Sequence, residues 1–310
     1  MEIEQELAKI TPPQGETLLT IGVFDGVHAG HRYLLEKLKR RAAERRLLSA
    51  VVTFDPHPQS VLHPHEQLPW LSSLEDRIRA LEELDVKIVA VLTFTPKLAQ
   101  LGARDFMSLL RKYLKMRGIM VGPDFILGRG GQGNISLLRA LGGEMEFTVN
   151  VVPPFTIEGE VVSSTLIRQA LAQGDMRRVE SLMGRRFHLR GKVTTSDKRG
   201  RLLGFPTANL DIKPRQALPG NGTYATITLV NGQRFPSATN VGTRPTFGEG
   251  ERMVETYLLD YRGDLYGRQL RIEFVRKLRN EQRFPSAEEL IVQMRKDVQE
   301  VDAILAEDLR

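Results

Sequence analysis

Residues 17–31 read TLLTIGVFDGVHAGH, and the expected architecture of the first half follows from this segment. An apolar run of strand length (17–21) enters a glycine-containing turn, and an amphipathic stretch at 32–45 follows directly. Four more apolar runs of strand length recur along the first half of the chain, at 47–54, 87–94, 117–122 and 146–152. These runs are uninterrupted rather than alternating, as in strands that are buried on both faces.

Amphipathic stretches separate these runs, at 74–85, 104–115 and 134–142. Strand–helix–strand alternation predicts an α/β unit, a parallel Rossmann-like sheet with helices on both faces. Ser72 with Glu75 three residues on predicts the cap of the helix from 74. In such sheets, ligands bind at the carboxyl ends of the strands.

The pattern changes near 184–188, where polar and apolar residues begin to alternate in short strands separated by Gly, Pro and Asn turns. This alternation predicts an antiparallel barrel or sandwich. A terminal helix is expected from Ser286, capped together with Glu289, with an apolar stripe facing the barrel. The stripe consists of Leu290, Ile291, Met294, Val298, Val301 and Leu305. We therefore expect two domains, 1–185 and 186–310.

The composition limits the class of protein. Apolar residues make up 41% and charged residues 26% of the 310, which is ordinary for a soluble globular protein. The absence of cysteine excludes disulfide scaffolds, thiolate metal sites and a cysteine nucleophile. No apolar run is long enough to span a bilayer, and the acidic start MEIEQELAKI is not a secretory signal. We expect a cytoplasmic protein without membrane partners.

The net charge of +6 is spread along the chain. Such an excess suits anionic small molecules, such as nucleotides, at least as well as nucleic acid, and much of it is ordinary solvated surface. We expect no nucleic-acid partner. The sequence does not indicate an oligomeric state.

The turn after the first strand is suited to phosphate. Gly22 and Gly30 allow close backbone approach, and the following helix offers free N–H groups and the positive end of its dipole. His28 and His31, three residues apart, can both face this point and donate N–H to phosphate oxygens. Two alternatives are histidines that merely begin a helix, and a zinc site that also uses the histidines at 57–65.

The string TIGVFDGVHAGH (20–31), with VTFDPHP (52–58) and SSTLIR (163–168), resembles the FAD synthetase module of the bacterial bifunctional riboflavin kinase/FAD synthetase family. The resemblance implies transfer of AMP from ATP to FMN, giving FAD and pyrophosphate, with His28 and His31 as catalytic residues. It implies that ATP is bound by Gly22, Phe24, Asp25, Gly30, Ser164, Thr165 and Arg168. It implies that the flavin is bound by His57, Asp124 and Phe125.

Two further observations concern the segments at 163–168 and 122–134. Ser164 and Thr165 can cap the helix that begins there, and Arg168, one turn in, can reach triphosphate oxygens. The loop at 122–134 departs from the family pattern, because Leu127 replaces a common aromatic residue and Asn134 a frequent acid.

The string GRLLGFPTAN (200–209) resembles riboflavin kinase. Thr207 and Asn209 alternate on a strand, and their hard oxygen atoms suit Mg²⁺ together with ATP phosphates. The resemblance implies phosphorylation of riboflavin to FMN, with Glu255 as the catalytic carboxylate, although Tyr257 replaces a common histidine nearby. It implies that ATP is bound by Gly191, Lys198, Gly200, Arg201 and Pro206. It implies that the flavin is bound by Asp264, Arg279, Glu281 and Arg283.

Three alternatives stay open at this point. The chain could be a nucleotidyltransferase for another substrate, but the kinase string does not fit that reading. It could be a flavin- or nucleotide-sensing protein with a degenerate site, to which Asn134 gives some support. It could bind nucleic acid, in which case binding would weaken sharply with salt.

Overall fold

The computed structural model describes residues 2–10, 15–66, 68–194, 205–243, 252–306 and 308. The chain divides into two compact units, residues 1–164 and 165–310. In this division the helices α8 (Ser164–Gln173) and α9 (Met176–Met183) fall almost entirely in the second unit. The domain boundary at 185/186 stays a prediction from the sequence.

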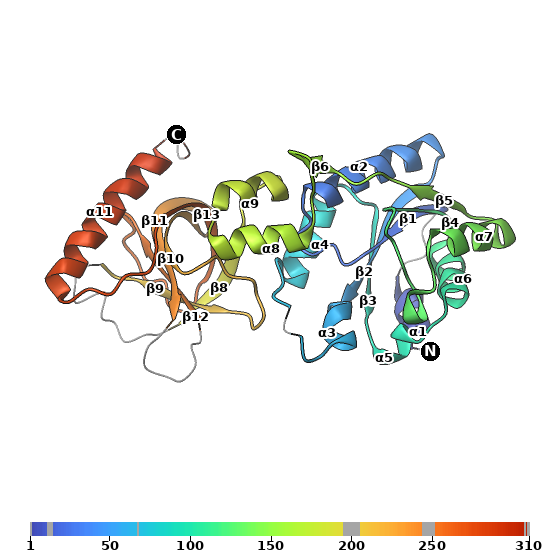
Figure 1. Ribbon diagram of the computed structural model, residues 1–310, viewed down its shortest axis with the longest axis horizontal. Coiled ribbons are helices and arrows are strands. Elements are labelled where there is room, and N and C mark those ends of the chain that lie inside the picture. The colour runs from blue at the N-terminus through green and yellow to red at the C-terminus, as the bar shows by residue number, and fades with distance from the viewer. Residues whose placement is uncertain are drawn as a thin grey trace. The chain divides into compact units, whose positions relative to one another are not determined.

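The first unit is built on a five-stranded parallel sheet in the order β3-β2-β1-β4-β5 (Figure 1). The strands are β1 (Thr17–Ile21), β2 (Leu48–Asp55), β3 (Ile88–Thr93), β4 (Met116–Val121) and β5 (Thr148–Val151). Every β1 residue is buried, which explains why the run is apolar throughout. The predicted parallel α/β architecture is confirmed.

Helices cover both faces of this sheet. Leu19, Ala50 and Ile119 face a core shared with α1 (Glu2–Lys9), α6 (Ala103–Leu114) and α7 (Ile135–Met145). Leu18, Val51 and Met120 face a core shared with α2 (Ala29–Glu44) and α4 (Leu74–Glu82). The shorter elements are α3 (Pro58–Leu62), α5 (Pro96–Ala99), the 3₁₀ turn η1 (Arg129–Gly131), β6 (Thr156–Ile157) and β7 (Glu160–Val161).

The strand order contains a switch point next to β1. The chain passes from β1 to β2 and β3 on one side, and β4 and β5 lie on the other. The turn that follows β1 and the loop that follows β4 therefore leave neighbouring strands at the same edge. Ligands of open α/β sheets bind in the crevice at this position.

Two predicted helix starts are corrected. α2 begins at Ala29, three residues before the expected 32, because His28 is itself the N-cap. α4 is capped by Ser73, whose Oγ accepts the N–H of Asp76 at 3.1 Å, so the cap lies one residue after the predicted Ser72. The hydroxyl of Ser72 instead contacts the turn after β1.

The second unit contains a closed six-stranded barrel in the order β10-β11-β12-β9-β8-β13, with antiparallel pairing throughout. The strands are β8 (His188–Thr194), β9 (Ala208–Ile212), β10 (Gly222–Val230), β11 (Gln233–Thr243), β12 (Arg252–Leu258) and β13 (Gln269–Arg279). The barrel alternative of the sequence-based prediction is thus confirmed.

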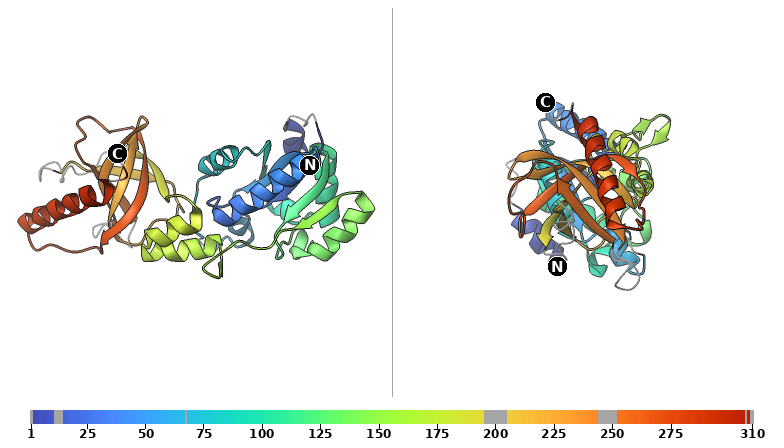
Figure 2. Two further views of the ribbon diagram at one scale, coloured as in Figure 1. Left: turned by 90° about the horizontal axis from the view of Figure 1, so that it is seen from above. Right: turned by 90° about the vertical axis from the view of Figure 1, so that its left-hand side faces the viewer.

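The terminal helix α11 (Ala287–Leu305) lies along the outside of the barrel, against β10 and β11 (Figure 2). Ser286 caps it by accepting the N–H of Glu289 at 3.3 Å, as predicted. The predicted stripe is buried only in part. Val301 and Leu305 join the core on this face of the barrel, whereas Leu290, Ile291 and Met294 are half-buried.

The barrel interior contains a chain of fully buried hydroxyl groups. Thr226 Oγ1 lies 2.9 Å from Ser237 Oγ and 2.7 Å from Thr239 Oγ1, which in turn donates to Thr256 Oγ1 at 2.9 Å. Burying a hydroxyl group without a hydrogen-bond partner costs free energy, and mutual hydrogen bonding removes that cost.

Within the described ranges, no helix has both the length and the apolar character that crossing a membrane requires.

Candidate functional sites

The turn after β1 places the two predicted catalytic histidines against each other. Their rings stack with centroids 3.6 Å apart. The Nδ1 of His28 accepts the backbone N–H of His31 at 3.3 Å, and the Nδ1 of His31 accepts the backbone N–H of His28 at 3.3 Å. This is a reciprocal capping box built from two imidazoles at the N-terminus of α2.

The capping box sets the protonation pattern of both rings. A backbone N–H can only donate, so each Nδ1 must be unprotonated and the neutral imidazole carries its proton on Nε2. Each ring then carries its donor on Nε2, and both rings stand at the positive end of the α2 dipole. This arrangement suits an anionic phosphate group.

The turn is held in a strained conformation. Phe24 and Val27 both have positive φ, at 55° and 38°, although neither is glycine and Val27 is β-branched. A Cβ on Gly30 would lie 3.2 Å from the His28 ring and 3.2 Å from the carbonyl oxygen of Val162. The predicted need for glycine at position 30 therefore has a steric cause. Such strain is typical of functional turns.

Asp25 was predicted to bind ATP, but its carboxylate is already used within the protein. It is 4% exposed and accepts hydrogen bonds from the N–H of Leu71 (3.0 Å) and from the N–H of Ser72 (3.1 Å). The Ser72 hydroxyl also donates to it at 3.3 Å. The geometry gives this carboxylate a role in holding the turn. Phe24 is also buried, with its ring 5.0 Å from that of His31.

The predicted flavin-binding residues follow β2 and β4, the two neighbours of β1. His57 caps the short helix α3 through Nδ1, which accepts the N–H of Gln59 at 3.2 Å. Asp124 is exposed in the loop after β4, and Phe125 is partly buried against the sheet core. Asn134 caps α7 by accepting the N–H of Leu137 at 3.0 Å, a structural use of the residue that departs from the family pattern.

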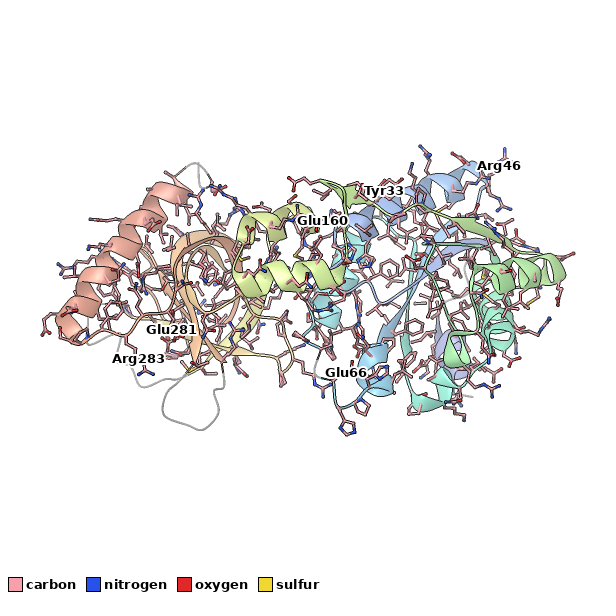
Figure 3. The ribbon with its side chains drawn as sticks, viewed as in Figure 1. Tyr33, Arg46, Glu66, Glu160, Glu281 and Arg283 are labelled. Carbon is pink, nitrogen blue, oxygen red and sulfur yellow. The ribbon has the colours of Figure 1, made fainter. Side chains whose placement is uncertain are left out.

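The second nucleotidyltransferase signature begins α8. Ser164 is the first residue of the helix, and its hydroxyl donates to the backbone carbonyl of Asp25 at 3.1 Å. Ser164 is thus the first helical residue, and its hydroxyl contacts the histidine turn of the same unit. Thr165 and Arg168 belong to the second unit, and their contact with ATP stays a prediction. Tyr33 of α2 packs against Phe155 nearby in the same unit, at 5.3 Å between ring centroids (Figure 3).

In the barrel, the predicted metal ligand and the predicted base are direct neighbours. Asn209 of β9 lies opposite Glu255 of β12 in the antiparallel register, and Asn240 of β11 lies opposite Glu255 on its other side. Cβ atoms of such opposed residues are about 4.5–5.5 Å apart. Asn209 is buried and Glu255 is partly buried. Three polar side chains thus follow one another across three strands.

A pocket of about 520 Å³ lies at the start of β9. It brings together Pro206 and Thr207 before β9 and Asp264 in the loop before β13. Asp264 Oδ1 accepts the N–H of Tyr266 at 2.9 Å, which shapes that loop. Predicted ATP-, metal- and flavin-binding residues therefore share one cavity, although they are distant in sequence.

Other predicted barrel residues have structural partners. The guanidinium of Arg279 forms an ion pair with Asp297 of α11, with Nη2 to Oδ2 at 2.8 Å, so its predicted contact with flavin competes with a buried partner. Glu281 and Arg283 lie on the segment after β13 (Figure 3), and the Glu281 carboxylate accepts the amide of Asn221 at 3.0 Å. Gly191 lies between β9 and β13, where a Cβ would come within 2.7 Å of the Asp211 carbonyl.

Three predicted ATP-binding residues of the kinase, Lys198, Gly200 and Arg201, lie outside the described residues. Among the described residues, no three His, Asp or Glu side chains gather in a way that could hold a metal ion.

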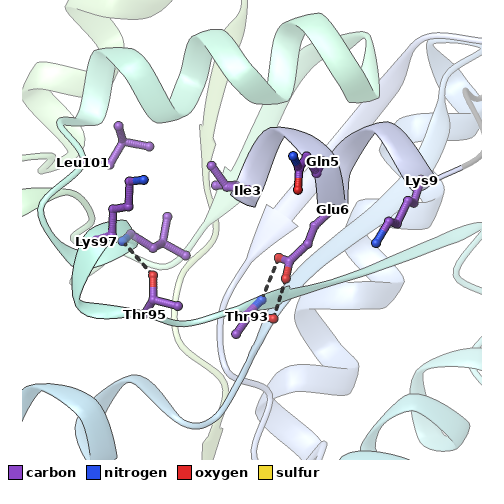
Figure 4. A pocket seen from close by; sticks show the side chains of 9 residues that line it. Ile3, Gln5, Glu6, Lys9, Thr93, Thr95, Lys97 and Leu101 are labelled. Carbon is purple, nitrogen blue, oxygen red and sulfur yellow. Dashed lines mark hydrogen bonds between the residues drawn. The ribbon is translucent and has the colours of Figure 1, made fainter. Parts of the chain in front are cut away.

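A separate pocket of about 280 Å³ beside α1 contains none of the predicted site residues (Figure 4). Glu6 accepts the N–H of Thr93 there at 2.9 Å.

The sequence reasoning missed Arg77 and Asn240 as candidate site residues. Arg77 is a buried cation on α4, one helical turn after Ser73. Its spacing of three and four residues from Ala80 and Leu81 places it on the buried face of α4, which was a usable signal. Asn240 could have been found only from the strand register.

Both halves of the chain are similar to known proteins. Residues 10–166 match the family model described as FAD synthetase, and residues 183–305 match riboflavin kinase. The bifunctional riboflavin kinase/FMN adenylyltransferase of Escherichia coli strain K12 is 40% identical over 92% of this chain and 91% of its own. That of Pseudomonas fluorescens is 37% identical over 99% and 98%, respectively.

A crystal structure described as a macrolide-efflux protein from Streptococcus pneumoniae matches 96% of both chains, with a TM-score of 0.87 and 27% identity. The α/β unit with its histidine turn, followed by the barrel, defines a two-domain transferase with one catalytic unit for each of two reactions. The chain belongs to the family of bifunctional riboflavin kinase/FMN adenylyltransferases. Its C-terminal part phosphorylates riboflavin to FMN, and its N-terminal part converts FMN to FAD; ATP is the co-substrate of both.

Proposed function

We propose that His28 and His31 stabilise the transition state of adenylyl transfer, in which an oxygen of the FMN phosphate attacks the α-phosphorus of ATP and pyrophosphate leaves. This nucleophile is already anionic at pH 7, so the step needs no protein base. Orientation and charge stabilisation then carry the rate. The supporting observation is the reciprocal capping of the two rings, which leaves Nε2–H as the donor on each.

For the kinase we propose that Glu255 accepts the proton of the ribityl 5′-hydroxyl as that oxygen attacks the γ-phosphorus of ATP. Thr207 and Asn209 would hold Mg²⁺, since a hydroxyl and an amide oxygen are hard donors, and Asn209 lies opposite Glu255 in the strand register. When bound, Mg²⁺ supplies positive charge that neutralises the phosphates. Pro206 and Asp264 line the same pocket and are assigned to ATP and flavin, respectively.

The remaining assignments rest on motif position alone. We assign ATP binding in the kinase also to Gly191, Lys198, Gly200 and Arg201, and in the adenylyltransferase to the backbone of the histidine turn with Thr165 and Arg168. A cytoplasmic location, and the lack of nucleic-acid and membrane partners, stay predictions from the sequence.

One experiment tests the metal assignment. The full chain is given riboflavin and ATP over a series of Mg²⁺ concentrations, and FMN and FAD are separated by chromatography. Asn209→Ala should raise the Mg²⁺ concentration needed for half-maximal FMN formation by about tenfold or more, as expected when a metal site loses a ligand. FAD formation from supplied FMN should keep the wild-type Mg²⁺ dependence. An unchanged Mg²⁺ requirement for FMN formation would refute the assignment.

A further inference from the structure

We infer that Arg77 of α4 is a positioning residue for adenylyl transfer, because its guanidinium fixes the histidine turn after β1 against the end of β2. The inference rests on the proposed assignment of this reaction to His28 and His31. Its Nη1 and Nη2 donate to backbone carbonyls, so Arg77 acts through the backbone.

The guanidinium joins two backbone carbonyls at the ends of neighbouring strands. Its Nη1 donates to the carbonyl oxygen of Val23 at 2.8 Å, and its Nη2 donates to that of Phe54 at 3.0 Å. Val23 lies two residues after β1, and Phe54 is near the end of β2. The Val23 carbonyl also accepts the Thr53 hydroxyl at 3.0 Å. One side chain therefore spans the two strand ends that lead to His28 and to His57.

The chemistry of these contacts requires arginine. Its planar fork offers several N–H donors in a fixed geometry, whereas a lysine ammonium is a single point charge. Arg77 is 5% exposed, and burial lowers the pKa of its guanidinium against the opposing effects of Asp25 and Asp55. Asp55 Oδ1 lies 3.6 Å from Nη2. Its Nε is buried without a hydrogen-bond partner, so the two carbonyls and the nearby carboxylate carry the compensation, and the buried cation becomes costly if one of them is removed.

A second set of contacts fixes the other end of the turn to the residues that lead into the same helix. The backbone N–H of Gly26 donates to Ser72 Oγ at 2.9 Å, and the Asp25 carboxylate accepts the N–H groups of Leu71 and Ser72. Ser73 then caps α4, so Arg77 projects from the next helical turn. The histidine turn is thus attached to the start of α4 at two separate places.

This double attachment explains how the strained turn persists. Phe24 and Val27 adopt positive φ angles that non-glycine residues avoid, and such residues persist only where surrounding contacts over-determine them. Both residues lie between the Val23 carbonyl and His28. Without the guanidinium, the turn would lose one of its attachments and the imidazoles would lose their fixed direction. A displacement of about 1 Å can cost about 10²-fold in rate.

The test compares Arg77→Met with Arg77→Lys and with Arg79→Met. Arg79 lies on the same helix, but it faces solvent and pairs only loosely with Asp76 at 3.9 Å, so it is a matched control. FAD formation from FMN and ATP is measured at several concentrations of each substrate. Riboflavin kinase activity of the same chain serves as the internal standard. The single tryptophan, Trp70, lies in the first unit, and its fluorescence reports unfolding of that unit.

Arg77→Met should lower kcat for FAD formation by about 10- to 100-fold, with a smaller change in KM for ATP. Arg77→Lys should recover part of kcat, and Arg79→Met should match the wild type. Kinase activity should be unchanged in all three. A purely structural role predicts instead an earlier Trp70 unfolding transition with wild-type kcat at temperatures well below it. That result would overturn the inference.

If Arg77→Met does not fold, the Ser72→Ala variant tests whether the attachment of the histidine turn to the start of α4 supports adenylyl transfer. It removes the hydroxyl that contacts Gly26 and Asp25 without leaving a buried charge unpaired. We expect a lower kcat for FAD formation with normal kinase activity, and wild-type kcat would refute the double attachment. Failure of the underlying assignment looks different, because His31→Ala would then still form FAD at the wild-type rate.

Discussion

His28 and His31 hold each other in place. The Nδ1 atom of each ring accepts the backbone N–H of the other residue at 3.3 Å, and the rings stack at 3.6 Å. Each imidazole therefore fixes the ring of its partner. Removing either one costs more than a single hydrogen bond, because the remaining ring loses its stacking neighbour and half of the capping box.

Replacement of His31 should separate the two activities. His31→Ala should lower FAD formation from FMN and ATP by at least about 10²-fold, the loss typical of removing one donor to a developing charge. FMN formation from riboflavin should be unchanged. Chromatography of both products measures the outcome. Loss of both activities together would argue against two separate sites.

Replacement of Glu255 should do the reverse. Glu255→Gln keeps the shape of the side chain but removes its basicity, so FMN formation should fall by about 10²- to 10⁴-fold, the usual contribution of a general base. Conversion of supplied FMN to FAD should continue at the wild-type rate. Asp211→Asn on β9 is a control on the same barrel, since this exposed residue pairs with Lys192 in the register and is not among the assigned site residues. Wild-type kinase activity in Glu255→Gln would remove the base assignment.

Glycine at position 30 should be needed for adenylyl transfer rather than for stability. An added Cβ would come within 3.2 Å of the His28 ring, so Gly30→Ala should displace that ring and lower kcat for FAD formation. Gly143 of α7 has open space around its added Cβ. Gly143→Ala should therefore leave activity intact and stabilise its helix by roughly 0.5–1 kcal/mol. Thermal unfolding and steady-state kinetics of both variants decide; equal kcat values would contradict the steric argument.

Tyr224 should make the folding stability of the barrel fall as the pH rises above 10. Burial raises the pKa of its phenol from 10 to about 12, and its hydroxyl donates to the Gly220 carbonyl. The folded state therefore keeps this proton longer than the unfolded state, so the contribution to stability is complete below pH 10 and is lost as the pH rises toward 12. A shift of this size corresponds to a few kcal/mol, on the order of 3 kcal/mol.

Tyrosinate absorbance at 295 nm checks this prediction. The difference between the titration curves of the wild type and Tyr224→Phe should show one phenol with a midpoint near 12. The wild type should also lose more stability than Tyr224→Phe between pH 10 and 12. A midpoint near 10 would show that the phenol is accessible to solvent.

Local pattern was sufficient for much of the fold. A parallel α/β unit was predicted from the apolar run at 17–21 and the amphipathic stretches, and an antiparallel barrel from the alternating strands after 184. Strands buried on both faces are apolar throughout, whereas strands buried on one face alternate apolar and polar residues. Element ends were less certain. Ser73 rather than Ser72 caps α4, since the Ser72 hydroxyl is used by Gly26, which is 46 residues away in sequence.

Residue order alone was enough to predict the histidine turn and the family to which both halves belong. The way those residues are used depends on how the chain is packed in three dimensions. In the folded chain, Asn209 lies opposite Glu255 and the Asp25 carboxylate is buried against Leu71 and Ser72. Arg77 donates hydrogen bonds at the ends of two strands. Strand register and hydrogen bonds between distant segments depend on the packing of the whole chain, so a linear pattern does not encode them locally.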